Sequence, residues 1–83
     1  MARPMKTKKS WYRVFIKPRN TQNILKKDCE EKCDYIYVEA YTGVIAMSII
    51  QQYIVENDMT FRPIHFHRVK DGEQIDYSKT INQ

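Results

Sequence analysis

Glycine, proline and cysteine are scarce in this sequence, with two, three and two copies among 83 residues. So little glycine and proline excludes collagen-like repeats, flexible linkers and glycine-rich nucleotide loops, and two cysteines are too few for a disulfide scaffold. No apolar run reaches the ~18–20 residues that span a bilayer. The basic start, MARPMKTKKSWYR, has no apolar stretch behind it, so we expect no secretory signal. The sequence therefore predicts a cytoplasmic protein, in the host cytoplasm if it is viral, with no membrane partner.

The residue sets that carry catalysis are missing too. The acidic residues are scattered without a paired pattern for acid–base work. Cys29 and Cys33 lie in a charged stretch, KKDCEEKCD, with no obvious oxyanion donors nearby. These cysteines could join His65 and His67 in a Cys₂His₂ zinc site, but the CxxxC spacing is looser than the usual zinc pair. We therefore predict no enzymatic activity, and no metal, cofactor or small-molecule substrate.

Positive charge is concentrated at the amino-terminal end. Residues 1–19 hold seven lysines and arginines and no acid, while residues 20–83 hold seven against ten acids, so +7 and −3 give the net +4. With 42% hydrophobic and 29% charged residues, the chain has the composition of a globular domain. Residues 1–10 offer few apolar groups, so we predict a flexible basic arm. Such an arm attracts an acidic protein face or nucleic acid, or is only a solvated tail.

Three segments, residues 11–17, 35–40 and 61–70, have the aromatic and β-branched composition and the alternation of β-strands. Pro63 favours a position at the edge of the sheet for the third strand, because proline has no N–H to donate to the hydrogen-bond ladder. Val69 is out of phase with the apolar residues before it, which leaves room for a bulge or a register change. The alternation predicts these core-facing residues: Tyr12, Val14, Ile16, Ile36, Val38, Ala40, Ile64 and Phe66.

A helix is predicted over residues 43–57, with Thr42 as its N-cap. Its main apolar stripe follows the i, i+4 spacing through Ile45 and Ile49, and we expect Ile49 to be nearly fully buried. A neighbouring stripe is formed by Met47, Ile50 and Ile54. So wide an apolar surface is typical of a helix that packs on a sheet.

These elements predict an α+β fold with the order β-β-α-β, in which the first strand is the centre of a three-stranded antiparallel sheet and one helix packs on one face. The domain is expected to cover residues 11–72. Residues 19–33 are predicted as a long loop with room for a helical turn, and residues 73–83 as a tail or a short strand around residues 75–77. The second face of the sheet would remain uncovered and would carry Trp11, Arg13, Phe15, Tyr35, Tyr37, His65 and His67.

The segment EAYTGVIAMSIIQQYIVENDMTFRPIHFHRVK resembles the strand–helix–strand half of the small podophage inhibitors of bacterial RNA polymerase. The resemblance covers residues 11–70, while the long segment 19–33 and a less acidic second half depart from the family pattern. It implies that Arg68 and Lys70, on the last strand, contact an acidic polymerase surface. The matching features are Trp11, Tyr12, Ala40, Thr42, Ala46 and the stretch from His67 to Lys70.

The sequence therefore predicts a small binding protein that occupies a host macromolecule with an acidic surface, such as RNA polymerase. Arg68 and Lys70 are the expected partner-binding residues, together with Arg62, His67 and Arg13. One alternative is a nucleic-acid-binding protein that uses the basic arm and the aromatic sheet face. Another is a structural component of a larger assembly.

Overall fold

The computed structural model describes residues 8–20, 22, 24–57 and 60–81, and most of the predicted arm, residues 1–7, lies outside these ranges. The first strand starts at Ser10, one residue before its predicted start. The elements in chain order are β1 (Ser10–Pro18), the 3₁₀ turn η1 (Lys26–Asp28), the single-turn helix α1 (Cys29–Lys32), β2 (Asp34–Ala40), α2 (Gly43–Asn57), β3 (Phe61–Arg68) and the 3₁₀ turn η2 (Tyr77–Lys79).

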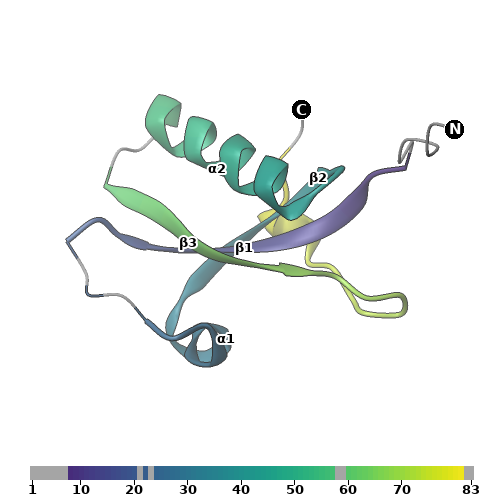
Figure 1. Cartoon of the computed structure of the whole chain (residues 1–83), viewed down its shortest axis with the longest axis horizontal. Helices are drawn as coiled ribbons and strands as arrows, with labels where there is room; N and C mark the ends of the chain where they lie inside the picture. The colour runs from purple at the N-terminus through teal and green to yellow at the C-terminus, as the bar shows by residue number, and fades with distance from the viewer. Residues whose placement is uncertain (1–7, 21, 23, 58–59, 82–83) are drawn as a thin grey trace, which may run out of the picture.

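The three strands form one antiparallel sheet in the order β2-β1-β3, and α2 lies across one of its faces (Figure 1). This confirms the predicted α+β fold with the first strand central. Tyr12 lies opposite Val38 and Val14 opposite Ile36, so the apolar sets of β1 and β2 share the face below α2. β3 is an edge strand, which accommodates Pro63 because the missing N–H breaks no interior ladder.

Both ends of α2 are set by side chains close to them. The backbone N–H of Ile45 donates to Thr42 Oγ1 at 3.1 Å, so Thr42 is the N-cap that the sequence predicts. At the other end, Asn57 Nδ2 donates to the carbonyl oxygen of Tyr53 at 2.9 Å. This bond satisfies one of the carbonyls that a helix leaves unpaired in its last turn.

The side of α2 that packs on the sheet differs from the prediction. Ala46 and Ile50 are fully buried and Ile54 is nearly so, whereas Ile49 is only partly buried and Ile45 is exposed. The expectation that Ile49 is nearly fully buried is therefore wrong. Consecutive helix residues lie about 100° apart, so two neighbouring stripes of similar hydrophobicity can each serve as the core face. The stripe that packs on the sheet is the one that contains the small residue Ala46.

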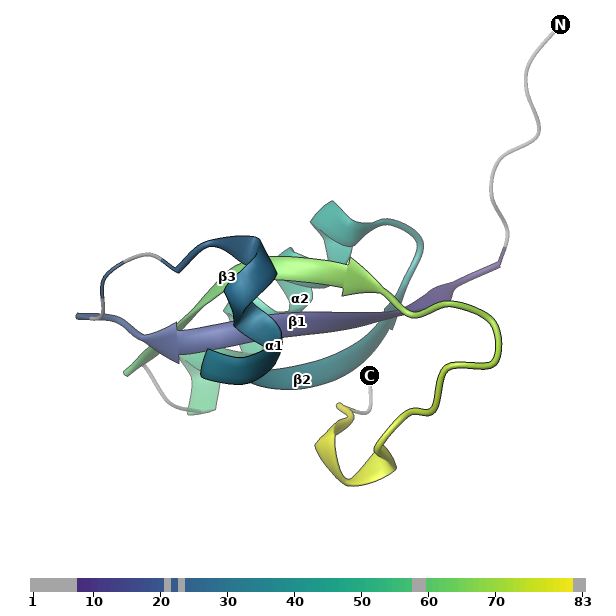
Figure 2. The same ribbon diagram turned by 90° about the horizontal axis from the view of Figure 1, so that it is seen from below.

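The expectation of an uncovered sheet face is also wrong. The short helix α1 lies on the side of the sheet away from α2 (Figure 2). On this side Phe15 and Tyr37 are each only 2% exposed, and Cys29, the first residue of α1, is fully buried. At the end of the same face, Trp11 packs edge-on against Tyr77 with 6.0 Å between ring centroids. The segment predicted as a loop therefore closes a second, smaller layer of packing.

The carboxy-terminal segment docks on the free edge of β2. Thr80 forms a parallel bridge with Tyr37, and the backbone N–H of Ile81 donates to the carbonyl oxygen of Tyr37 at 3.2 Å. Of the two predicted alternatives for this segment, a tail or a short strand, the structure shows no strand at residues 75–77, because Asp76 is the N-cap of η2 and Tyr77 its first residue. Ordered packing therefore extends past the predicted domain boundary at residue 72.

Candidate functional site

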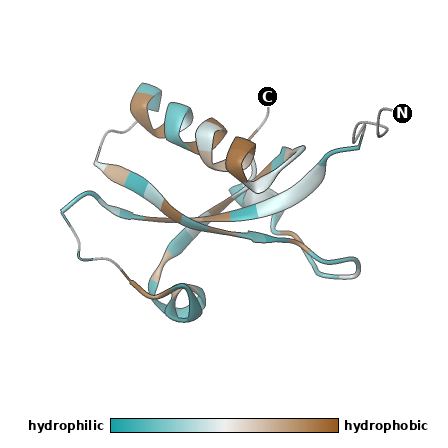
Figure 3. Cartoon of the chain, viewed as in Figure 1, coloured by the Kyte–Doolittle hydropathy of each residue, from teal (hydrophilic) through white to brown (hydrophobic). Residues whose placement is uncertain are grey.

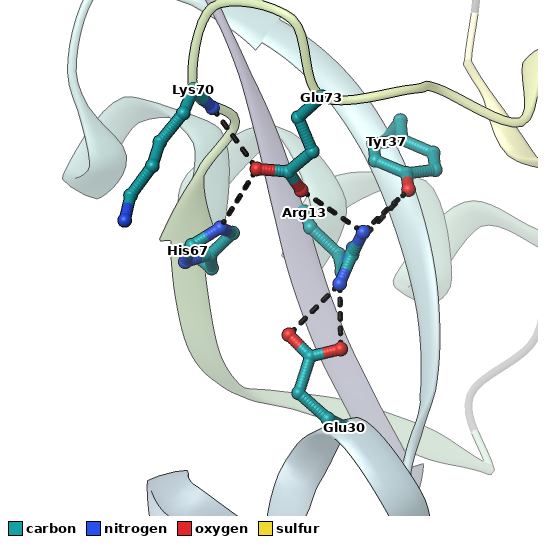
Figure 4. Close-up of polar contacts among 6 residues, drawn as sticks. All are labelled: Arg13, Glu30, Tyr37, His67, Lys70 and Glu73. Atoms are coloured by element: carbon teal, nitrogen blue, oxygen red, sulfur yellow. Dashed lines mark hydrogen bonds and ion pairs between the residues drawn. The ribbon is translucent and has the colours of Figure 1, made fainter.

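Arg13, on the α1 side of the central strand, is held by three other parts of the chain (Figure 4). Its Nη1 donates to both carboxylate oxygens of Glu30, at 2.8 and 2.6 Å. Its Nη2 donates to Tyr37 Oη at 2.9 Å and to Glu73 Oε2 at 3.1 Å. The side chain is 14% exposed. The guanidinium therefore ties α1, β2 and the carboxy-terminal segment to β1.

The second oxygen of Glu73 completes this network. Glu73 Oε1 accepts a hydrogen bond from the backbone N–H of Lys70 at 3.1 Å and lies 3.4 Å from His67 Nε2. The N–H of Lys70, followed by His67 and the charge of Arg13, lowers the pKa of Glu73 although partial burial acts in the opposite direction. The shift favours the carboxylate form of Glu73, and this carboxylate links the turn after β3 to the central strand.

A β-bulge in β3 decides which side chains face the α1 side. The pairing steps from His65 to Pro63 between consecutive residues of β1, so Ile64 is the extra residue. Phe66 packs against the core as predicted, whereas Ile64 lines the pocket described next. Because of the bulge, Arg62 and His65 lie on the same face although they are three residues apart. The bulge therefore gathers basic side chains on one side of β3.

A pocket of about 400 Å³ lies between β3 and the segment that leads into η1. Among the residues that the structure describes, none that lines it is acidic. His65 Nε2 lies 3.0 Å from the carbonyl oxygen of Ile24, and because a carbonyl only accepts, this ring nitrogen donates and holds the segment against β3. The Nζ of Lys26 lies 5.3 Å from the ring centroid of Phe66, a cation–π contact. The lining residues are Ile24, Leu25, Lys26, Arg62, Pro63, Ile64 and His65.

Lys17 adds a further positive charge beside this pocket. It lies directly opposite Arg62 on the β1–β3 pair, so the two cations leave the same face of the sheet. Arg19 follows at the exposed end of β1, where its backbone N–H donates to the carbonyl oxygen of Thr60 at 2.7 Å. We call Lys17, Lys26, Arg62 and His65 the basic cluster.

The five predicted partner-binding residues fall in three places. Arg13 and His67 belong to the network of Figure 4, where both contact the same carboxylate. Arg62 belongs to the basic cluster at the start of β3. Arg68 and Lys70 are exposed near the other end of that strand. The structure thus brings Arg13 and His67 together and keeps them apart from Arg62.

Sequence reasoning missed Lys17, Lys26 and His65 as members of one cluster. Lys17 meets Arg62 only through the strand register, and Lys26 arrives from a segment that the sequence predicts as a loop. One sequence feature could have indicated the cluster. Two short basic runs, Lys17 to Arg19 and Lys26–Lys27, lie at the two ends of the segment that joins β1 to η1.

The two cysteines are both free. Burial, followed by a hydrogen bond with Cys33 and the neighbouring acids Asp28 and Glu30, raises the pKa of Cys29 to about 11. A thiol of this kind is a poor nucleophile at neutral pH. Within residues 8–20, 22, 24–57 and 60–81, no three His, Cys, Asp or Glu side chains are grouped so that they could hold a metal ion.

Comparisons with protein-family models, curated proteins and solved structures find no match for this chain. In the described part of the chain, no helix has the length and hydrophobicity needed to cross a membrane. The chemistry open to the basic cluster therefore follows from its geometry alone. Cations around a concave surface without acidic lining favour the binding of an anionic group.

Proposed function

We propose that this protein is a non-enzymatic binding protein that recognises an acidic surface on another macromolecule through the basic cluster. The observation that carries this proposal is the pairing of Lys17 with Arg62 beside a pocket whose described lining residues include no acid. The two cations leave neighbouring strands on the same face, so an anionic group on a partner is attracted by both.

The size of the cationic surface favours a macromolecular partner. Arg68 lies six residues beyond Arg62 on β3, which at ~3.3 Å per residue places the two about 20 Å apart. With Lys70 exposed beyond Arg68, positive side chains occur at both ends of this edge strand. Arg62 leaves the α1 side of the sheet and Arg68 the α2 side. A small anion fits only one end, whereas an acidic protein surface that wraps around the edge of β3 can contact both. Arg68 and Lys70 therefore remain in the proposed contact surface.

A protein fits this surface better than a nucleic acid does. Bases stack on exposed aromatic rings, but Phe15 and Tyr37 are buried and Trp11 packs against Tyr77. The aromatic face on which the nucleic-acid alternative depended is therefore covered by α1 and the carboxy-terminal segment. The basic arm, residues 1–10, is the remaining route to nucleic acid.

The resemblance to the podophage inhibitors supports bacterial RNA polymerase as the first partner to test, in the host cytoplasm. A protein of this kind acts by occupying its partner's surface, without catalysis of its own. An acidic face on another host protein satisfies the same chemistry. A role as a structural component of a larger assembly would instead require contacts that do not depend on these cations.

The experiment is a pull-down from nuclease-treated bacterial lysate with probing for RNA polymerase. Lys26→Glu and Arg68→Glu should each weaken capture at least about fivefold, because each places a negative charge against an acidic partner. The matched control is Lys32→Glu, which makes the same change in net charge at an exposed position in α1. All variants are checked by circular dichroism, since exposed substitutions usually change stability by only about 0.5 kcal/mol.

Equal capture by Lys26→Glu, Arg68→Glu and Lys32→Glu would contradict the proposed surface. A salt titration with generic DNA and RNA tests the nucleic-acid alternative. Tight binding that weakens steeply with salt and is lost when residues 1–10 are deleted would favour that alternative, because each phosphate contact releases counterions.

A further inference from the structure

The side of α2 that faces away from the sheet is uncharged along its centre and carries exposed apolar side chains. Val44, Ile45 and Val55 are 72%, 42% and 44% exposed, and Ser48 and Gln52 are exposed between them. Hydrophobic bands alternate with hydrophilic and neutral ones along α2 (Figure 3). A surface helix normally has one apolar face, which packs on the core, and a charged face towards solvent. A second apolar face on an exposed helix indicates an interaction surface.

This outer face also has grooves into which the side chains of a second helix could pack. Two shallow grooves run along it, and Ser48 and Gln52 line both of them. Ile45 and Ile49 complete one groove. The small Ser48 side chain lies between the grooves, so a second helix could approach to the ~8–10 Å at which ridges and grooves interdigitate. The other groove is completed by Met47, Gln51, Val55 and Pro63.

Charge occurs only at the two ends of this face. Within α2 the single charged residue is Glu56, in the last turn. At the first turn, which holds no acid, Arg68 is exposed on the α2 side of the sheet opposite Tyr12, and Lys9 Nζ lies 5.5 Å from the ring centroid of Tyr41. The positive end of the helix dipole adds to these cations. The outer face therefore has a neutral centre and a carboxylate in its last turn, and the two cations lie near the end of the sheet where α2 begins.

We propose that the outer face of α2 binds a second copy of this chain, with the two helices antiparallel. A two-fold axis near Ser48 and Gln52 then places Glu56 of each copy beside the first helical turn of the other, where Arg68 and Lys9 lie. The two end contacts are equivalent, as a two-fold interface requires. This dimer does not depend on the basic cluster and goes beyond the proposed function, with which it shares only Arg68.

The charge pattern favours a second copy over a foreign partner. The neutral centre offers no charge by which an acidic partner could be selected, and two such centres can meet without placing like charges against each other. Valine and isoleucine side chains are self-complementary, and the amide of Gln52 has both a donor and an acceptor to offer its symmetry mate. A parallel pairing would instead place like charges together at each end.

The test is sedimentation of the full chain over a range from about 10 μM to about 1 mM. The wild-type protein should shift from the 10.0 kDa monomer to a species of twice that mass. Ser48→Arg buries a charge from each copy at the centre, so the dimer dissociation constant should rise more than about 100-fold. Glu56→Lys should raise it about tenfold, because it reverses both end contacts. The matched control, Gln74→Arg, adds the same charge at an exposed position outside α2 and should leave the dissociation constant unchanged.

A wild-type chain that stays monomeric over this range would overturn the proposal, as would a dimer that Ser48→Arg leaves intact. A dimer weakened by Ser48→Arg but strengthened by Glu56→Lys would overturn the antiparallel arrangement. Circular dichroism of each variant separates loss of the dimer from loss of the fold. If Ser48→Arg proves unfolded, Val44→Lys makes the equivalent change at the most exposed position of the face and decides the question.

Discussion

Arg13 and Glu73 lie 60 residues apart in the sequence, yet Arg13 Nη2 donates to Glu73 Oε2 at 3.1 Å. The contact joins the central strand to the turn that follows β3. The same arginine also reaches Glu30 in α1, so a single side chain connects two segments that the sequence predicts as a loop and a tail. These segments cover the α1 side of the sheet, and their packing therefore depends on this cation and its two carboxylates.

Glu73→Gln should lower the free energy of unfolding by about 1–2 kcal/mol, because the contacts of a carboxylate with Arg13, His67 and the Lys70 N–H are replaced by weaker ones. The matched control is Asp71→Asn, an exposed acid in the same turn, which should change stability little. The measurement is urea denaturation at pH 7.

The same contribution should depend on pH. The folded-state pKa of Glu73 lies below its ordinary value of 4.5, so the stabilisation is fully present above about pH 4.5 and is lost as the pH falls through the folded-state pKa. The stability difference between the wild type and Glu73→Gln should therefore shrink below pH 4.5. A difference that grows on acidification would show that Glu73 is not stabilised as the carboxylate.

Ile50→Ala should destabilise the domain by about 2–5 kcal/mol, because Ile50 is fully buried between α2 and the sheet. Ile49→Ala, one residue earlier, should cost clearly less because Ile49 is only partly buried. Thermal denaturation of this matched pair checks which stripe of α2 forms the core. Equal losses at both positions, or a larger loss at Ile49, would contradict the helix orientation.

Gly43→Ala should destabilise the protein although alanine has the higher helix propensity. A Cβ at Gly43 would overlap the ring of Phe66, which packs against the first turn of α2. The loss should be roughly 1–3 kcal/mol, as is usual when extra atoms are forced into a packed core. Phe66→Leu makes room at this position, so the double variant should lose less stability than the sum of the two single variants.

The two cysteines should react at very different rates with a thiol reagent. Cys33 is partly exposed, whereas Cys29 is buried and its pKa is raised to about 11 by burial and by its hydrogen bond with Cys33. Labelling at pH 8 followed by mass spectrometry should therefore find Cys33 modified first and Cys29 modified only as the protein unfolds. Comparable rates in the native protein would contradict the placement of α1 against the sheet.

Most of the fold could be predicted because alternation, the N-cap and proline placement are local signals. Thr42 and Pro63 mark a helix start and an edge strand without any tertiary information. The phase of α2 could not be predicted, since Ile49 and Ile50 belong to neighbouring stripes of similar hydrophobicity. The difference lay in shape, because the sheet accepts the small Ala46 in the stripe that contains Ile50.

The candidate site was less predictable because it depends on register. Arg62 was expected to bind a partner, but its neighbour Lys17 follows only from the pairing of β1 with β3. The bulge at Ile64 then brings His65 onto the same face, and no local sequence signal fixes where a bulge falls. Arg13, also expected to bind a partner, has its guanidinium donors engaged within the chain.

The most direct test of the central claim is nuclear magnetic resonance mapping of the ¹⁵N-labelled full chain titrated with an acidic peptide such as oligoglutamate. The basic cluster predicts the largest shift changes at Lys17, Lys26 and Arg62, with smaller changes around Arg68. Lys26→Glu should reduce these changes, while Lys32→Glu should preserve them. Shift changes confined to α2, or spread evenly over all exposed lysines, would contradict the assignment of the basic cluster as the binding site.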